Sequence, residues 1–250
     1  MTDLQTNSQA EPDASGTTAH YGGSIQSTLA GDAQLDVMEV IREGWDCTLG
    51  IKGMVVAGVL LIYAAVGLIS VILGLIFGFE NQPFYASTVS QLVIMMILYP
   101  FMAGVFMLGL KRSVGLTVEF REQFSMYGMT LPILGVGVLQ SVATSVGLVF
   151  LILPGLYLAI ALSLAIPLKV EKNLAVVECL VTSLRLVNQN FLQVALLGLA
   201  STALMVVGIL SLIGWIWTVP WTIMIFSITY RQLAGYDPAG EASGRATVSY

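Results

Sequence analysis

The sequence predicts an all-α polytopic membrane protein with six transmembrane helices and cytoplasmic amphipathic helices at the membrane interface. Three observations lead to this prediction. Of the 250 residues, 56% are hydrophobic and 10% are charged, whereas soluble globular domains contain about 25% charged residues. Six long apolar runs contain no charged residue. The basic residues occupy only alternate connections between these runs, which is typical of a chain that crosses a membrane repeatedly.

The lengths of the apolar runs decide which of them can cross a bilayer. A span needs about 20 apolar residues to cross a hydrocarbon core of about 30 Å, and the first, second, third and fifth runs meet this requirement. The fourth and sixth runs are shorter, so we expect them to stand upright or to include flanking residues such as Val170 and Trp215. For the fourth run, a re-entrant half-span is the alternative. The runs cover residues 53–79, 90–110, 131–153, 154–168, 191–212 and 214–230.

The basic residues orient these spans. All ten lie in connections that fall on one side of the membrane, and the other three connections hold none. Because basic loops stay in the cytoplasm, both termini are predicted to be cytoplasmic. The first fifty residues lack the apolar segment of a cleavable signal peptide, so we expect the first span to direct insertion. The basic residues are Arg42 and Lys52, then Lys111, Arg112 and Arg121, then Lys169, Lys172 and Arg185, and finally Arg231 and Arg245.

The membrane domain is predicted to cover residues 35–234, between disordered cytoplasmic tails at 1–34 and 235–250 that are too poor in large apolar side chains to fold. The segments that lead into spans one, three and five repeat apolar residues at helical spacing opposite charged ones, which predicts three interfacial helices. Three parallel copies of one unit, each a helix followed by two spans, would explain this pattern, and so would convergence of amphipathic composition. In the first helix the apolar residues are Leu35, Met38, Ile41, Trp45 and Leu49.

A candidate polar site within the membrane lies on span three. Gln140 is followed one turn later by Thr144, and prolines at positions 100, 167 and 220 interrupt spans two, four and six. A proline frees a backbone carbonyl, which is how transporters expose polar backbone in a cavity. The simpler explanations are an interhelical hydrogen bond for Gln140 and ordinary kinks for Pro100, Pro167 and Pro220. No span holds an ionisable residue, which argues against coupling to protons or sodium through a buried carboxylate.

Small residues on span three predict a packing face. Gly137, Ser141 and Ser145 recur at steps of four, and such a stripe lets another helix approach closely. We therefore expect span three to be central, with Gly147 away from the contact.

Patterns for enzymatic chemistry are missing. The sole histidine, His20, lies in the predicted N-terminal tail, and no Gly-rich phosphate loop is present. Cys47 and Cys179 both fall in cytoplasmic segments, so we expect free thiols. No basic run suggests nucleic-acid binding. We therefore expect no enzymatic activity, no cofactor and no metal site.

The segment from Leu153 to Asn190 resembles a known group of proteins. It is similar to bacterial six-span inner-membrane proteins of the YciC type and, more loosely, to the membrane domain attached to some glycerophosphodiester phosphodiesterases. The resemblance implies six helices, an outer Pro-Gly turn and location in a bacterial cytoplasmic (inner) membrane. It implies no activity, because the phosphodiesterase is a separate soluble domain that this chain lacks. The matching residues are Leu153-Pro154-Gly155-Leu156-Tyr157, Pro167, Glu171-Lys172-Asn173, Val177-Glu178-Cys179, and Ser183-Leu184-Arg185-Leu186-Val187 with Asn190; many relatives carry Ala where this chain has Cys179.

Two functions fit these features. The first is a structural or accessory envelope component without enzymatic activity, whose partners are membrane lipids and other membrane proteins, because interfacial helices and basic span ends suit lipid contact. The alternative is a carrier for a neutral or lipophilic solute, built around Gln140, Thr144 and the three prolines. A midplane chamber lined by those residues would favour the carrier, whereas a solid core would favour the accessory protein.

Reporter fusions test the topology. Reporters placed after residues 79, 154 and 213 are expected to behave as external, and those after residues 111, 172 and 231 as cytoplasmic, because basic connections remain inside. One reversed pair would contradict the assigned orientation.

Overall fold

A computed structural model describes residues 21–33, 35–78, 84–211 and 213–238, and within these ranges the fold is all-α, as predicted. The one β-pairing in this described part is an isolated antiparallel bridge between Tyr21 and Tyr236. The elements are α1 (Ile25–Ala30), α2 (Val37–Thr48), α3 (Lys52–Phe77), α4 (Phe84–Ser113), η1 (Phe120–Met129, a 3-10 helix), α5 (Thr130–Phe150), α6 (Ile152–Ala161), α7 (Ala165–Lys172), α8 (Val176–Gln189), α9 (Phe191–Leu210) and α10 (Trp215–Ala234).

Five segments are long and apolar enough to cross a membrane, which makes the chain a multi-pass membrane protein. The fourth consists of two helices, α6 and α7, separated by a turn at residues 162–164. The sixth predicted span corresponds to α10, which is not among the five because Thr, Ser and Gln side chains and Arg231 lower its hydropathy. The five segments are Lys52–Phe77, Tyr85–Ser113, Phe120–Phe150, Ile152–Lys172 and Phe191–Leu210.

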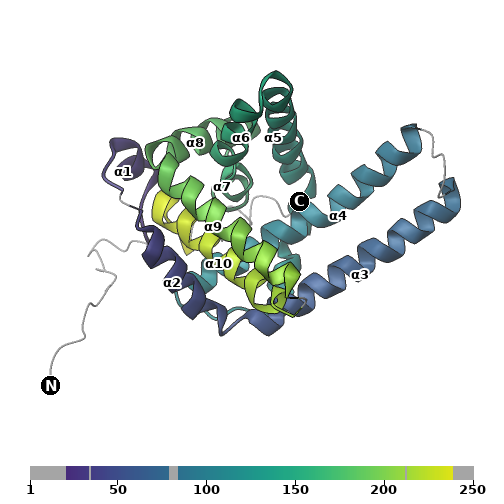
Figure 1. Ribbon diagram of the computed structural model, residues 1–250, viewed down its shortest axis with the longest axis horizontal. Coiled ribbons are helices and arrows are strands. Elements are labelled where there is room, and N and C mark those ends of the chain that lie inside the picture. The colour runs from purple at the N-terminus through teal and green to yellow at the C-terminus, as the bar shows by residue number, and fades with distance from the viewer. Residues whose placement is uncertain (1–20, 34, 79–83, 212, 239–250) are drawn as a thin grey trace.

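Helix α10 forms the centre of the molecule, and this corrects the expectation that span three would be central. It packs against α2, α4 and α9 (Figure 1), and most of its C-terminal half is buried. In the most apolar stretch of the segment that contains α5, only 22% of the residues are buried, against 50% in the corresponding stretch of α4. Small residues allow the close approach to α10: Gly44 of α2 faces Ile225, and Gly109 of α4 faces Ser227. Length and hydropathy identify spans, but they do not say which span the others surround.

The hairpin of α3 and α4 extends away from the rest of the molecule (Figure 1), and only 11% of the apolar window of α3 is buried. Helices α5 and α6 form a second hairpin, and α9 with α10 a third. The large apolar side chains of α3 that remain exposed include Leu60, Leu61, Leu68 and Leu75. Because so much apolar surface is uncovered, its neighbours must be lipid or other apolar protein surfaces.

Part of the segment expected to be a disordered tail is ordered. Ser24 begins α1 through a capping box with Ser27, and the Thr28 hydroxyl donates to the Leu233 carbonyl at 2.6 Å. Backbone hydrogen bonds of 2.9 Å join Tyr21 and Tyr236 in both directions. The two ends of the described chain therefore lie side by side. Residues 1–20, including His20, lie outside the described residues.

The three segments in which interfacial helices are predicted are helical in the structure, as α2, η1 and α8. Asp36 begins α2 by accepting from the backbone N–H groups of Met38 and Glu39 at 2.8 and 3.2 Å. The face of α2 that is buried in the protein is Val40, Gly44 and Thr48. Of the predicted apolar stripe, Leu35 is buried, whereas Met38, Trp45 and Leu49 are exposed. The reason is that Gly44 permits close contact with α10, so the smaller side chains face the protein.

The small-residue stripe on α5 is brought into contact only at Gly137, where an added Cβ would lie 3.1 Å from the Tyr99 ring. Ser141 and Ser145 are exposed. Gly147, expected to lie away from the packing face, is instead buried at the crossing of α5 and α6, where a Cβ would lie 3.0 Å from the Gly155 Cα. The closest approach on α5 is thus made with its own hairpin partner.

Leucine substitutions distinguish these two contacts. Gly147→Leu is expected to destabilise the protein more than Gly137→Leu, by roughly 1–3 kcal/mol, because it meets backbone, whereas the Tyr99 ring can rotate away. Thermal unfolding in detergent measures both, with Gly67→Leu as control, since nothing lies within 4 Å of a Cβ at Gly67. An equal or larger loss at Gly137 would contradict the assigned crossing.

Candidate functional site

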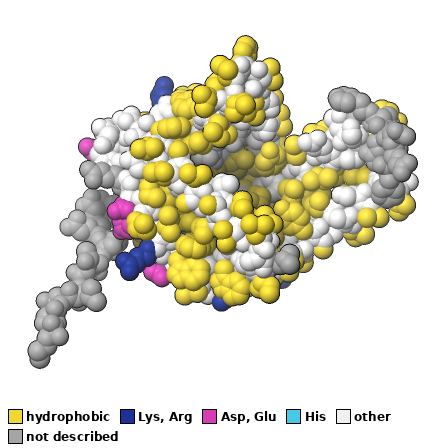
Figure 2. All heavy atoms as spheres, viewed as in Figure 1, with side chains coloured by type: hydrophobic (Ala, Val, Ile, Leu, Met, Phe, Trp, Pro, Cys, Tyr) yellow, Lys and Arg dark blue, Asp and Glu magenta, His cyan; other side chains and the backbone are white. Residues whose placement is uncertain are grey.

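Three apolar cavities adjoin each other around Thr222 of α10, with volumes of about 300, 290 and 190 Å³. The first lies between α4, α7 and α10, the second between α6, α9 and α10, and the third between α3, α4 and α10. Thr222 lines all three, and Ser163 and Phe226 line the first two. Figure 2 shows this face of the molecule hollowed between the arm of α3 and α4 and the rest of the chain, with hydrophobic side chains around the hollow.

Two hydroxyl groups in the cavity wall have no hydrogen-bond partner. The oxygens of Ser163 and Thr222 are both buried and both unpaired. On α10, Thr229 donates to the Ile225 carbonyl at 2.7 Å and Ser227 to the Phe106 carbonyl at 3.2 Å, whereas the buried Thr218 hydroxyl also has no partner. A buried polar group without a partner costs about 1–3 kcal/mol. Ser163 and Thr222 thus line the cavities, but their hydroxyl oxygens are buried and are not exposed to them.

The position of Ser163 follows from the turn between α6 and α7. Ser183 of α8 is buried and holds this turn, since its hydroxyl accepts from the Leu164 N–H at 3.1 Å and donates to the Ala161 carbonyl at 2.8 Å. Pro167, four residues after Ser163, has no N–H with which to continue a helical bond to the Ser163 carbonyl. The Ala161 carbonyl and the Leu164 N–H are therefore bonded to α8, whereas the Ser163 carbonyl receives no helical hydrogen bond from position 167.

The residues of the predicted polar site are not brought together. Pro167 lines the first cavity. Pro100 and Pro220 are buried inside α4 and α10 without lining any of the three cavities. Gln140 and Thr144 are half-buried on α5 and also lie outside the three cavities, although the Gln140 Oε1 atom is buried and unpaired. Sequence reasoning missed Ser163 and Thr222; the one available signal was a hydroxyl residue close to proline in each of spans four and six.

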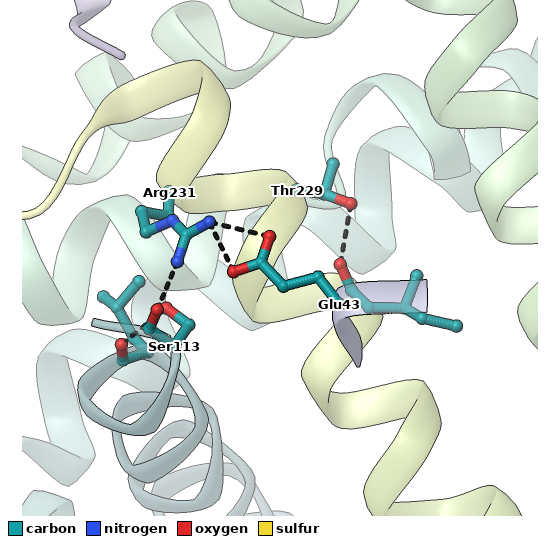
Figure 3. Close-up of polar contacts among 6 residues, drawn as sticks. Glu43, Ser113, Thr229 and Arg231 are labelled. Atoms are coloured by element: carbon teal, nitrogen blue, oxygen red, sulfur yellow. Dashed lines mark hydrogen bonds and ion pairs between the residues drawn. The ribbon is translucent and has the colours of Figure 1, made fainter. Parts of the chain in front are cut away.

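A second polar region lies at the C-terminal end of α10. The Arg231 guanidinium donates through Nη2 to both carboxylate oxygens of Glu43, at 2.7 and 2.9 Å, and through Nη1 to the Ser113 carbonyl. Figure 3 shows the Arg231 side chain between Glu43 and Ser113, while Thr229 bonds within its own helix. This contact joins α2, the end of α4 and α10. Because both the guanidinium and the carboxylate are charged, the Arg231–Glu43 bonds belong to the stronger class of hydrogen bonds.

Glu171 forms another junction at this end of the molecule. Its side chain is 1% exposed and lies 2.8 Å from the Lys172 ammonium. It accepts from the Tyr230 hydroxyl at 2.7 Å and from the Asp237 N–H at 3.3 Å. A buried carboxylate is tolerated only when it is paired and hydrogen-bonded, and here α7, α10 and the segment after α10 supply the partners. The basic ends of the apolar helices are thus connected to one another by hydrogen bonds and ion pairs.

The two cysteines are free thiols that lie on different helices. Burial raises the pKa of Cys179 to about 11, and the nearby Glu178 adds to this. Burial, followed by the charge of Glu43, raises the pKa of Cys47. Neither thiol is therefore ionised appreciably at neutral pH, and a thiol that is not ionised is a poor nucleophile. Within the described ranges no group of three or more His, Cys, Asp or Glu residues could hold a metal ion.

Comparison of the chain with models of known families, with curated proteins and with solved structures found no match.

The Arg231 contact can be tested by substitution. Arg231→Met is expected to lower the free energy of unfolding by roughly 1–3 kcal/mol, because it leaves the Glu43 carboxylate and the Ser113 carbonyl without their donor. Chemical unfolding in detergent micelles measures the loss. Arg42→Met, at an exposed position of α2, is the matched control and should change stability by less than about 0.5 kcal/mol. Similar losses in both variants would show that the three-helix contact does not stabilise the fold.

Proposed function

We propose that this chain is a multi-pass membrane protein without enzymatic activity, a structural or accessory envelope component that acts by contact with lipid and with other membrane proteins. The observation that carries the proposal is the exposed apolar surface of the α3–α4 hairpin, of which Leu75 and Tyr63 are 72% and 63% exposed. A surface of this size is stable only against lipid or another protein. The described residues supply polar junctions for structure, and no set of groups suited to covalent chemistry accompanies them.

In the proposed topology α10 is a sixth span and both termini face the cytoplasm of a bacterium, with the chain in the inner membrane. Two observations support this arrangement. The basic residues keep to alternate connections, and the bridge between Tyr21 and Tyr236 requires both ends of the described chain to be on one side of the membrane. Membership of the YciC-type group remains part of the proposal, supported by the amphipathic helix α8 directly before α9. The predicted outer turn at Pro154-Gly155 is not found, because both residues lie within α6 and the chain reverses at Leu151.

The second candidate is a carrier for a neutral or lipophilic solute. The cavities around Thr222 favour it, because their walls are apolar and contain two unpaired hydroxyls. The residues expected to build a carrier site weaken it, since only Pro167 among them lines a cavity. A protein that binds an apolar molecule without transporting it would have such cavities and would not need the predicted carrier residues around them. We therefore prefer the accessory function.

Flux measurements separate the two functions. Liposomes that contain the purified protein are expected to release an entrapped neutral dye and to exchange labelled lipid between leaflets no faster than protein-free liposomes. The same experiment with Thr222→Val and Gln140→Leu provides the control. Faster flux with the wild type that is lost in Thr222→Val, but kept in Gln140→Leu, would identify a carrier that uses the cavities and would overturn the accessory function.

A further inference from the structure

We propose that η1 is a two-state wedge: as a 3-10 helix it holds Gln123 between α3 and α4, and as an α-helix it withdraws Gln123 so that α3 closes on α4. The change would move the hairpin that carries the exposed apolar side chains of α3. It does not depend on whether the protein is an accessory component or a carrier, and so it goes beyond the proposed function.

Gln123 occupies a slot between the two helices of the hairpin. The residue is fully buried, and its Nε2 atom donates to the Met54 carbonyl of α3 at 3.1 Å. Gly58 of α3 lies against the Gln123 amide, and Gly104 of α4 lies against its backbone carbonyl. Both approaches are so close that a Cβ at either glycine would overlap Gln123. The residue therefore separates α3 from α4 at this level.

The wedged position leaves one polar atom of Gln123 unsatisfied. Its Oε1 atom is buried and has no hydrogen-bond partner. A buried polar atom without a partner costs free energy, which is regained when the atom reaches water or a donor. A position of Gln123 outside the slot removes this cost, so a second state of η1 has a favourable term that the wedged state lacks.

The cavity of about 190 Å³ between α3, α4 and α10 lies next to the wedge. Its wall includes Val59 and Val105, which directly follow Gly58 and Gly104 in the sequence. A residue that separates two helices also keeps the space beside it open. Without Gln123 between them, the two glycines would allow α3 and α4 to approach closely, as small residues do in membrane helices. The helices thus already carry the residues that a closed hairpin needs.

The helix that carries the wedge has an unusual form. η1 continues as a 3-10 helix over ten residues, whereas 3-10 runs longer than three or four residues are uncommon, because their hydrogen-bond geometry is poorer than that of an α-helix. Its sequence fits both forms. The buried residues recur every three positions, as in a 3-10 helix, whereas the aromatic residues recur at intervals of four and three, as in an α-helix. The buried residues are Gln123, Met126 and Met129, and the aromatic residues are Phe120, Phe124 and Tyr127.

Conversion to an α-helix would carry Gln123 out of its slot. A 3-10 helix turns by about 120° and rises by about 2.0 Å per residue, whereas an α-helix turns by about 100° and rises by about 1.5 Å. The Tyr127 hydroxyl holds η1 to α4 by donating to the Ile97 carbonyl at 2.8 Å. With Tyr127 in place, Gln123 would turn by about 80° around the helix axis and move by about 2 Å along it. A rotation of this size points its side chain away from the slot.

The separation of α3 and α4 tests the wedge. Spin labels are attached after Leu61→Cys and Met96→Cys, at exposed positions of the two helices, in a Cys47→Ala background in which the remaining Cys179 is fully buried. Double electron-electron resonance in lipid nanodiscs measures the distance between the labels. The otherwise unchanged protein gives the reference distance for the wedged state.

In Gly58→Ala the added Cβ overlaps the seated Gln123, so the label distance is expected to shorten as the wedge leaves and the helices close. Gly104→Ala should act in the same direction. A wedge with only one state would give the opposite result, because the methyl group would push α3 and α4 apart and lengthen the distance. Gly67→Ala is the matched control on α3, since nothing lies within 4 Å of a Cβ there, and should leave the distance unchanged.

A second measurement follows the helical form of η1. Nuclear Overhauser contacts distinguish the two forms, because backbone protons four residues apart approach each other in an α-helix and those two residues apart in a 3-10 helix. The glycine variants are expected to replace the 3-10 contacts of η1 by α-helical ones. A label distance that lengthens or stays unchanged in Gly58→Ala would overturn the inference, and so would an η1 that remains a 3-10 helix while the distance shortens.

Circular dichroism checks that each variant is folded. Should the glycine variants fail to fold, Gln123→Ala takes their place, because it empties the slot without adding an atom. The label distance is then expected to shorten. An unchanged distance in Gln123→Ala would show that other contacts hold α3 and α4 apart, and it would equally overturn the inference.

Discussion

The contact of Arg231 with Glu43 and Ser113 is the constraint on which the rest of the structure depends. It joins the last turn of α10 to α2, which precedes the first hairpin, and to the end of α4, which completes it. In a bilayer there is little hydrophobic gain when one apolar helix meets another, so specific polar contacts and close packing must determine which helices associate. Here these contacts concentrate at one end of α10, and the hairpins are free to diverge at the other.

Close packing along α10 supplements this polar junction. Gly109 allows α4 to approach Ser227, and the Trp221 indole donates to the Ile41 carbonyl at 3.0 Å while its ring lies 4.8 Å from that of Trp45. Several polar residues of α10, among them Trp221, Ser227 and Arg231, therefore contact other helices, and protein covers them. The same residues lower the hydropathy of α10 below that of the other five segments. A helix that holds a membrane domain together can thus carry a weaker membrane signal than the helices that surround it.

This explains how much of the fold the sequence predicts. The segments of α3, α4, α5 and α9 are found from length and hydropathy, and in those of α3, α5 and α9 most side chains face away from protein. The break between α6 and α7 is not predicted, because Leu162, Ser163 and Leu164 are compatible with a continuous helix and the residue that stabilises the turn is Ser183, about twenty positions later. Contacts between residues far apart in the sequence, such as Thr28 with Leu233, are likewise outside the reach of local patterns.

The candidate site was harder to predict for the same reason. Gln140, Thr144, Ser163 and Thr222 are all polar residues within apolar runs, and composition does not separate them. What distinguishes Ser163 and Thr222 is the combination of a cavity and a missing partner. Both depend on helices that are distant in the sequence, because α4, α6, α7 and α9 form the cavity walls together with α10.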